Sequence, residues 1–137
     1  MKNILITGGA GYIGSHIVEL LVNKRFNVFI VDNLSTGYKR LINKKAKFFN
    51  LNINNFLKIR KIIQENKINS VIHLAANLDV NESQKKPKKY YLNNVNATHT
   101  LIRAMKDSNV KNFVFSSTAA VYKDKIFKVN ENSATKP

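Results

Sequence analysis

The sequence predicts an α/β protein, a Rossmann-like parallel sheet with helices on both faces, and three observations support this. First, an apolar run at 3–7 leads into a turn at 8–14 that holds four of the chain's five glycines. Second, apolar residues at helical spacing follow that turn through residue 22. Third, further apolar runs alternate with helical patterns, and runs that are apolar on both faces are typical of buried parallel strands.

Each element follows from a local pattern. The apolar runs predict five strands, at 3–7, 26–32, 46–50, 70–74 and 111–116. The helical patterns predict helices at 12–24, 38–44, 54–66 and 88–108. The segments 33–37, 75–87 and 117–137 are expected to be loops, the second of them carrying Asn77, Asp79 and Asn81.

Two of these helices carry recognisable start signals. Asn54 or Asn55 can cap the helix that runs to about Asn66. Pro87 suits the start of the long helix, where a missing backbone N–H costs little. The apolar positions of that long helix predict its inner face, which consists of Val95, Leu101, Ile102 and Met105.

The glycine turn predicts a dinucleotide site. Gly8, Gly11 and Gly14 follow a strand and open a helix, so the backbone can approach a pyrophosphate and the helix N-terminus can bind it. Asp32 ends the second strand about 20 residues further on, where a carboxylate accepts hydrogen bonds from the adenosine ribose and disfavours a 2′-phosphate. The alternative for Asp32 is that it merely begins a turn. We expect NAD rather than NADP.

Other polar residues are weaker candidates. Ser116, Ser117 and Thr118 follow the fifth strand, where hydroxyls either bind substrate or cap the strand end, and both readings stay open. His16 and His99, like His73, lie far apart in the sequence and are interpreted as structural. We expect no metal site.

Composition limits the class of protein. The chain of 137 residues has no cysteine and no apolar run of bilayer length, and its first residues form a strand rather than a signal peptide, so a cytoplasmic protein with no membrane partner is expected. The net charge of +15 raises the alternative of a polyanion binder. Nineteen of the 23 cationic residues are lysines, and no aromatic residues alternate with them. We therefore favour lysines on solvated faces and no specific nucleic-acid partner.

Six stretches together carry a family resemblance. They are TGGAGYIGSH at 7–16, VDNLSTG at 31–37, VIHLAA at 71–76, NESQKKP at 81–87, YYLNNVNAT at 90–98 and NFVFSSTAAVY at 112–122. With them the chain resembles the extended short-chain dehydrogenase/reductase family (NAD-dependent epimerases and dehydratases), and most closely its UDP-glucose 4-epimerase branch.

The resemblance implies an NAD-dependent isomerase that interconverts UDP-glucose and UDP-galactose through a 4-keto intermediate, a nucleotide-sugar substrate and a homodimer. It implies that Thr118 is the active-site hydroxyl residue, both catalytic and substrate-binding. Asn52 stands where the family usually has an aspartate, and Asn81 where it usually has a glycine. The implied cofactor-binding residues are Gly8, Gly11, Tyr12, Ile13, Gly14, Asp32, Asn33, Leu34, Ser35, Thr36, Gly37, Asn52, Ile53, Leu74, Ala75, Ala76, Asn77, Leu78, Asn93 and Ser116.

The resemblance also implies a Tyr-x-x-x-Lys pair, and Tyr122 does not supply it because Ile126 stands four residues on. We therefore expect residues 1–137 to be an NAD-binding domain that stops after about five strands, lacks the C-terminal substrate region and is inactive alone. A non-catalytic NAD-binding module is one alternative. A sugar-nucleotide dehydratase is another, although Ala119 and Ala120 stand where such enzymes usually carry Asp-Glu.

Overall fold

The computed structural model describes residues 2–122 and 129–135, and Ile126 lies outside them. Its centre is one parallel sheet of five strands in the order β3-β2-β1-β4-β5. The strands are β1 (Asn3–Thr7), β2 (Asn27–Asp32), β3 (Lys47–Asn50), β4 (Ser70–His73) and β5 (Asn112–Phe115). The predicted Rossmann-like fold is confirmed. Because the chain turns from β3 back across β1 to β4, a crevice is expected where the carboxyl ends of β1 and β4 part.

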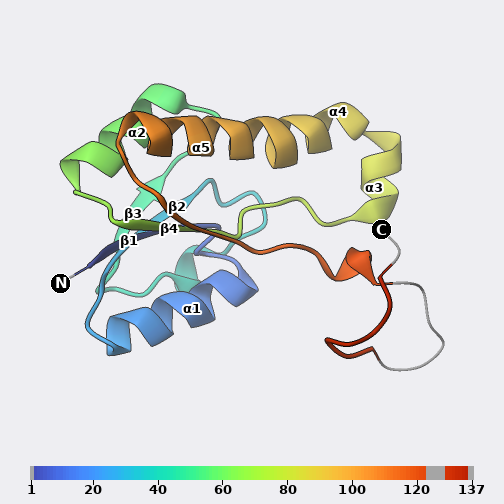
Figure 1. Ribbon diagram of the computed structural model, residues 1–137, viewed down its shortest axis with the longest axis horizontal. Coiled ribbons are helices and arrows are strands. Elements are labelled where there is room, and N and C mark those ends of the chain that lie inside the picture. The colour runs from blue at the N-terminus through green and yellow to red at the C-terminus, as the bar shows by residue number, and fades with distance from the viewer. Residues whose placement is uncertain (1, 123–128, 136–137) are drawn as a thin grey trace.

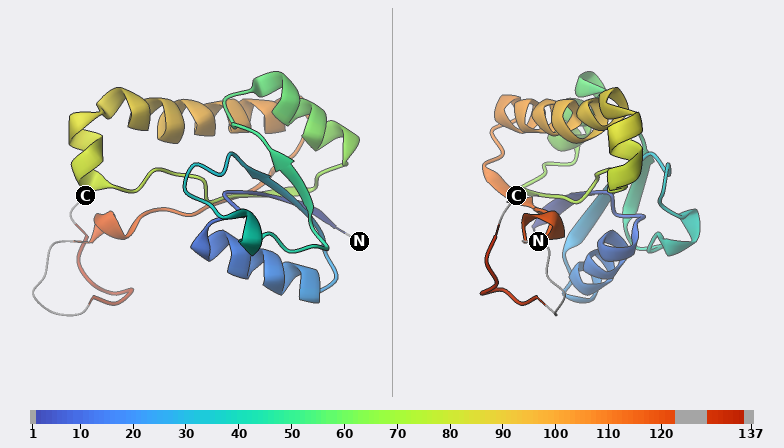
Figure 2. Two further views of the ribbon diagram at one scale, coloured as in Figure 1. Left: turned by 180° about the vertical axis from the view of Figure 1, so that it is seen from behind. Right: turned by 90° about the vertical axis from the view of Figure 1, so that its right-hand side faces the viewer.

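Helices cover both faces of the sheet (Figure 1). α1 (Tyr12–Asn23) lies on one face, and α2 (Phe56–Glu65) and α5 (Ala97–Asp107) lie together on the other. Figure 2 shows the same three layers from behind and from the side. α3 (Val80–Lys85) and α4 (Pro87–Tyr90) extend past the sheet at one end. Short 3-10 turns occupy Lys39–Leu41 and Ala119–Val121.

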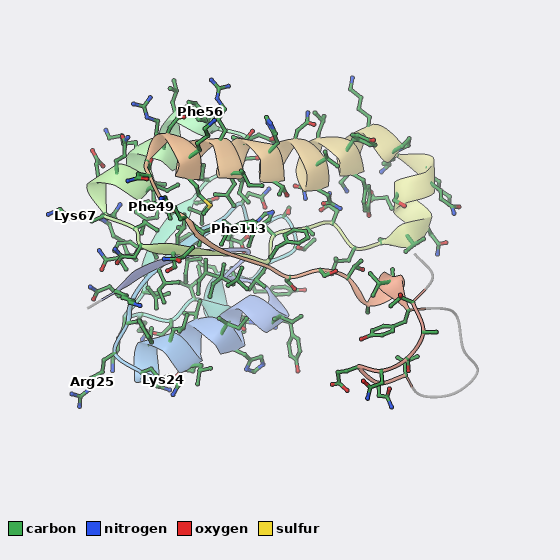
Figure 3. The ribbon with its side chains drawn as sticks, viewed as in Figure 1. Lys24, Arg25, Phe49, Phe56, Lys67 and Phe113 are labelled. Atoms are coloured by element: carbon green, nitrogen blue, oxygen red, sulfur yellow. The ribbon has the colours of Figure 1, made fainter. Side chains whose placement is uncertain are left out.

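Two cores explain why the strands are apolar on both faces. Ile4 and Ile6 of β1 pack under α1 with Val18, whereas Leu5 points the other way, into a larger core with Ile59 of α2 and Leu101 of α5. Phe49 and Phe113 add to this larger core between the sheet and the α2–α5 layer (Figure 3). Burying a Leu or Ile side chain fully stabilises by roughly 1.5–3 kcal/mol, so these positions dominate the stability of the sheet.

The predicted strands and long helices are confirmed to within two residues at most ends. Asn55 is the N-cap of α2 and accepts a hydrogen bond from the Lys58 N–H over 3.1 Å. The helix expected at 38–44 is wrong, because only the 3-10 turn Lys39–Leu41 forms there. Tyr38 is extended and donates its N–H to the Ala10 carbonyl over 3.0 Å, which ties this segment to the glycine turn.

The loop expected at 75–87 contains a helix, α3, so the placement of Asn81 in a loop is wrong. The Asp79 side chain caps this helix by accepting the Glu82 N–H over 2.9 Å. Asp followed three residues later by Glu is a helix-start signal that the sequence interpretation passed over. After β5, the described residues contain the 3-10 turn Ala119–Val121 and one bridge between Tyr122 and Thr135.

The long helix starts at Pro87 as predicted, but a π-helical stretch, Tyr91–Asn96, interrupts it. This wider turn rotates the residues before Ala97 relative to α5. Val95 is 51% exposed as a result, and Ile102, which lies within α5 beside the buried face of Ala97, Leu101, Ala104 and Met105, is 47% exposed, so the placement of both on the inner face is wrong. Leu101 and Met105 are buried as predicted. The remaining inner residues are Ala97 and Ala104.

Three helix ends share one conformation. Arg25, Lys67 and Asn109 follow α1, α2 and α5 with φ of 63°, 47° and 55°, in the left-handed region. In each case an apolar residue comes next and donates its N–H back to the helix, as Ile68 does to Ile63 over 3.0 Å. Glycine is usual at this position because other residues are strained there. Figure 3 shows Arg25 and Lys67 at the same end of the molecule.

Replacing Lys67 by glycine should stabilise the protein by about 0.5–1 kcal/mol, because it relieves the left-handed strain. Arg60→Gly is the matched control, since it removes a similar charge from the exposed face of α2 and should destabilise by about 1 kcal/mol. Urea unfolding of the two variants measures both effects. A Lys67→Gly variant less stable than the parent would contradict the strain argument.

Candidate functional site

A cleft of about 700 Å³ lies at the carboxyl ends of the strands, where the order of the sheet predicts a binding crevice. A volume of this size is typical of small-molecule sites. Every residue that the sequence analysis proposed for the cofactor lines it except Leu34, and so does Thr118. Ser117, a candidate substrate ligand in the sequence analysis, lines it as well, and the lining residues that the sequence analysis missed are Leu51, Ala97, Ala119 and Ala120.

Leu34 is the one predicted cofactor residue that is not among the residues lining the cleft, and its cofactor role stays a prediction. Its backbone has a φ of 59°, and its N–H donates to Oδ1 of Asp32 over 2.8 Å. Leu34 therefore shapes the loop after β2 through its backbone. The neighbouring Ser35, Thr36 and Gly37 do line the cleft.

The glycine turn is packed so closely that two of its glycines are required by the fold. Gly8 has a φ of 75°, and a Cβ there would lie 2.7 Å from the backbone nitrogen of Ala75. A Cβ on Gly14 would overlap the carbonyl oxygen of Gly8. Because these neighbours are backbone atoms, they cannot move aside. The end of β4 and the start of α1 are thus pressed against the same turn.

Gly11 differs from these two glycines. A Cβ on Gly11 would have only the Gly8 carbonyl oxygen near it, at 3.3 Å, so packing alone does not demand glycine there. Gly11 is the N-cap residue of α1, and no side chain among the described residues caps this helix start. The first N–H groups of α1 therefore stay available at the cleft, with Tyr12, Ile13 and Gly14 among its lining residues. This arrangement suits an anionic group such as a phosphate.

Asp32 holds the other side of the turn. Its carboxylate is buried, with the residue 8% exposed, at the end of β2. Oδ2 accepts the Ala10 N–H over 3.0 Å, and Oδ1 accepts the Leu34 N–H over 2.8 Å. The turn-forming role that the sequence left open is therefore real. Each oxygen still has a second lone pair, so a ribose role remains compatible with this geometry and stays a prediction.

Apolar side chains surround the mouth of the cleft. Tyr12 and Leu78 are 78% and 80% exposed, and Ile13 is exposed beside them. All three line the cleft. Large apolar groups left exposed around a concave site commonly mark a ligand surface.

The hydroxyl residues after β5 reach the same cleft. Ser116 donates its N–H to the His73 carbonyl over 3.2 Å and so continues the β4–β5 pairing. The Thr118 hydroxyl accepts the Ala120 N–H over 3.1 Å and caps the 3-10 turn Ala119–Val121. Thr118 lines the cleft and is exposed, and its hydroxyl hydrogen remains available to a bound group. Capping and ligand binding are therefore compatible at this residue.

His73 is buried beneath the cleft at the end of β4. The Thr98 hydroxyl donates to the Asn94 carbonyl over 2.6 Å, so it must accept from Nε2 of His73, 2.8 Å away. Nδ1 of His73 then accepts from the Thr7 hydroxyl. Burial lowers the pKa of His73 from 6.5 to about 4. The imidazole is thus a neutral structural link between β1, β4 and α5, as the sequence interpretation expected.

Glu82 joins α3 to α4 at the edge of the site. Its carboxylate accepts from the Lys89 ammonium over 2.8 Å and from the Tyr90 hydroxyl over 3.0 Å. These hydrogen bonds, that of Lys89 first, lower the pKa of Glu82 to about 2. Desolvation and the hydrogen bond to Glu82 raise the pKa of Tyr90. The hydrogen bonds from Lys89 and Tyr90 of α4 to Glu82 of α3 hold these two short helices together.

Two other kinds of feature, a cluster of metal ligands and a helix able to cross a membrane, are absent from the described residues. In residues 2–122 and 129–135, no three His, Cys, Asp or Glu side chains gather as metal ligands would. None of the helices in that part of the chain has the length and apolar character needed to cross a membrane.

Comparison with known proteins assigns the family. Residues 4–137 match the NAD dependent epimerase/dehydratase family. The chain belongs to this family. A UDP-glucose 4-epimerase of Lactobacillus helveticus is 48% identical over 119 residues, which are 87% of this chain and 36% of that protein.

Solved structures of the family agree. A crystal structure of a UDP-glucose 4-epimerase matches 99% of this chain and 42% of its own with a TM-score of 0.90 and 41% identity. The Brucella ovis enzyme, crystallised in complex with NAD, matches 100% of this chain and 42% of its own, with a TM-score of 0.88 and 34% identity. The chain spans about two fifths of the length of the curated relatives it matches.

Two departures from the epimerase pattern have local explanations. Asn52, at the position where the resemblance implies an aspartate, lines the cleft and accepts the Asn54 N–H on its Oδ1 over 2.9 Å, a bond that an aspartate oxygen could also accept. Asn81, which replaces the usual glycine, lies exposed in the first turn of α3. Neither substitution therefore disturbs the family fold.

The buried His73 should make stability depend on pH. Between its folded pKa of about 4 and its unfolded value of 6.5, only the unfolded chain takes up the proton, so stability is full above pH 6.5 and falls as the pH drops toward 4. We expect the free energy of unfolding to be about 2 kcal/mol smaller at about pH 5 than at about pH 7.

Urea unfolding of the parent, His73→Gln and His99→Gln at the two pH values measures this effect. His73→Gln should be less stable than the parent at neutral pH. Its free energy of unfolding should differ much less between the two pH values than that of the parent. His99 is exposed, so His99→Gln should keep it. An unchanged pH dependence in His73→Gln would show that another group causes it.

Proposed function

We propose that this chain is the NAD-binding part of a UDP-glucose 4-epimerase. The observation that supports this most directly is the uncapped start of α1, which opens on the cleft through Gly11, a glycine that packing does not require. Relatives named UDP-glucose 4-epimerase, and neighbours crystallised with NAD, add to the proposal.

Three parts of the cleft would hold the cofactor. The backbone of Gly11 and the first turn of α1 would bind the pyrophosphate. The Asp32 carboxylate would accept hydrogen bonds from the ribose hydroxyls of the adenosine half. Asn52 and Ile53 would lie beside the adenine. Residues 74–78 and Asn93 would line the other half, on the β4 side of the cleft.

Thr118 is proposed as the residue that contacts the reacting sugar. It lies beside β5 at the cleft, and its hydroxyl hydrogen can be donated to a sugar oxygen while its oxygen caps the following turn. When bound, NAD supplies the hydride acceptor and donor that an epimerase needs. Thr118 would then orient the sugar hydroxyl by donating its own hydroxyl hydrogen to the sugar oxygen. Ala119 and Ala120 carry no acid, so epimerisation is proposed in preference to dehydration.

We further propose a cytoplasmic homodimer. The absence of cysteine suits a reducing compartment. Tyr91, Leu92, Val95 and Ile102 are all exposed along the helical segment from the π-helix into α5. Large apolar side chains exposed together on helices are typical of subunit contacts.

Gly11→Ala tests the pyrophosphate site. The new methyl group leaves the fold intact but faces the phosphates, so NAD affinity should fall about tenfold or more while the melting temperature stays within about 2 °C. Calorimetry with NAD and a thermal melt measure both. Gly14→Ala is the contrasting variant and should lower the melting temperature itself, since its Cβ meets backbone. Equal NAD affinity in the parent and Gly11→Ala would contradict this assignment.

Asp32 tests the choice of nucleotide. The parent should bind NAD at least about tenfold more tightly than NADP, because a 2′-phosphate would meet the Asp32 carboxylate. Asp32→Asn removes the charge and should narrow that ratio, with a loss of about 1–2 kcal/mol in stability from the weakened bonds to Ala10 and Leu34. Titration calorimetry with each nucleotide measures the ratio. Tighter binding of NADP by the parent would refute the ribose role.

A further inference from the structure

Asn94 connects the long helix to the far wall of the cleft. Its Oδ1 accepts the Asn77 N–H over 2.8 Å, and its Nδ2 donates to the Asn77 carbonyl over 2.9 Å. One side-chain amide thus satisfies both backbone groups of one residue in the loop between β4 and α3. Asn77 lines the cleft, and Asn94 itself is not among the lining residues.

The same amide also orients a second lining residue. Nδ2 of Asn93 donates to Oδ1 of Asn94 over 3.0 Å, so that oxygen accepts from both Asn77 and Asn93. Asn93 belongs to the lining of the cleft. Asn94 therefore holds two parts of the cleft lining, the Asn77 backbone and the Asn93 side chain.

The backbone of Asn94 is held in turn by buried groups. Its carbonyl accepts the Thr98 hydroxyl, which is bonded to the buried His73. Asn94 lies in the π-helical stretch Tyr91–Asn96, a form of turn that often marks functional sites. We call the two hydrogen bonds between the Asn94 side chain and the Asn77 backbone the clamp. Through Thr98 and His73, hydrogen bonds connect this clamp to Thr7 of β1.

The topology of the sheet says which half of a dinucleotide this clamp serves. Asp32 lies at the end of β2, on one side of β1, and Asn77 follows β4 on the other side. With the pyrophosphate at the start of α1, the adenosine half lies toward Asp32. The half beyond the pyrophosphate then lies against the segment that Asn94 holds.

We propose that Asn94 is a positioning residue for the non-adenosine half of the dinucleotide, acting through Asn77 and Asn93. This inference rests on the proposed function. Without Asn94 the Asn77 segment loses both anchoring hydrogen bonds, so the wall of the cleft is free to move. The glycine turn and Asp32 keep their own contacts, and the adenosine half keeps its site.

The test compares two nucleotides on Asn94→Ala. ADP probes the adenosine half and the diphosphate, whereas NAD probes both halves. We expect the dissociation constant for NAD to rise about tenfold or more and that for ADP to change less than about twofold. Amide hydrogen exchange provides a readout without ligand, and the Asn77 N–H should exchange at least about tenfold faster in the variant. Asn96→Ala, an exposed residue in the same stretch, is the matched control and should alter none of these values.

Two results would overturn the inference. They are an equal loss of NAD and ADP affinity, which indicates general destabilisation, and unchanged NAD affinity in Asn94→Ala. If that variant fails to fold, Asn94→Asp replaces it, since it keeps an acceptor for the Asn77 N–H but places a charged carboxylate oxygen, in place of the donor, against the Asn77 carbonyl. The same selective loss of NAD affinity is expected. A parent that binds neither nucleotide would instead refute the proposed function, and the role of Asn94 toward the dinucleotide would fall with it.

Discussion

The close approach of the glycine turn to the end of β4 is the constraint on which the site depends. Gly8 passes so near Ala75 that no side chain fits between them, and Gly14 lies against the Gly8 carbonyl in the same way. This packing brings the start of α1 to the carboxyl edge of the sheet, where its free N–H groups meet the cleft. The opening turn therefore determines how β1, β4 and α1 meet, and it also places the free N–H groups, which suit an anion, at the cleft.

The two walls of the cleft are held by different means. On the β2 side, the Asp32 carboxylate joins the turn to the loop after β2 through short bonds to backbone N–H groups. On the β4 side, the wall is held by hydrogen bonds between neutral groups. They run from Asn77 to Asn94, from Asn94 to Thr98 and from Thr98 to His73. This network of neutral groups adds no charge beside the buried imidazole, whose own pKa is lowered by burial.

Local sequence patterns predicted an element correctly where the residues of that one segment are enough to determine it. The apolar runs located all five strands, and Asn55 and Pro87 marked the helix starts that the structure has. The errors occurred where distant segments decide. Tyr38 is pulled out of a helix by the Ala10 carbonyl, and Val95 is turned outward by the π-helical stretch ahead of α5.

The sequence by itself determined the five strands, the helices that pack on them, the glycine turn and the acidic residue at the end of β2, since each depends on the spacing of neighbouring residues. Only the tertiary structure decided that Leu34 acts through its backbone and that Ala97 reaches the cleft. It also decided that Asn94 clamps Asn77 across 17 positions of the chain. The physical reason is that hydrogen bonds between loops join residues whose separation in the sequence follows no period. Their partners are therefore determined by how the sheet and the long helix pack.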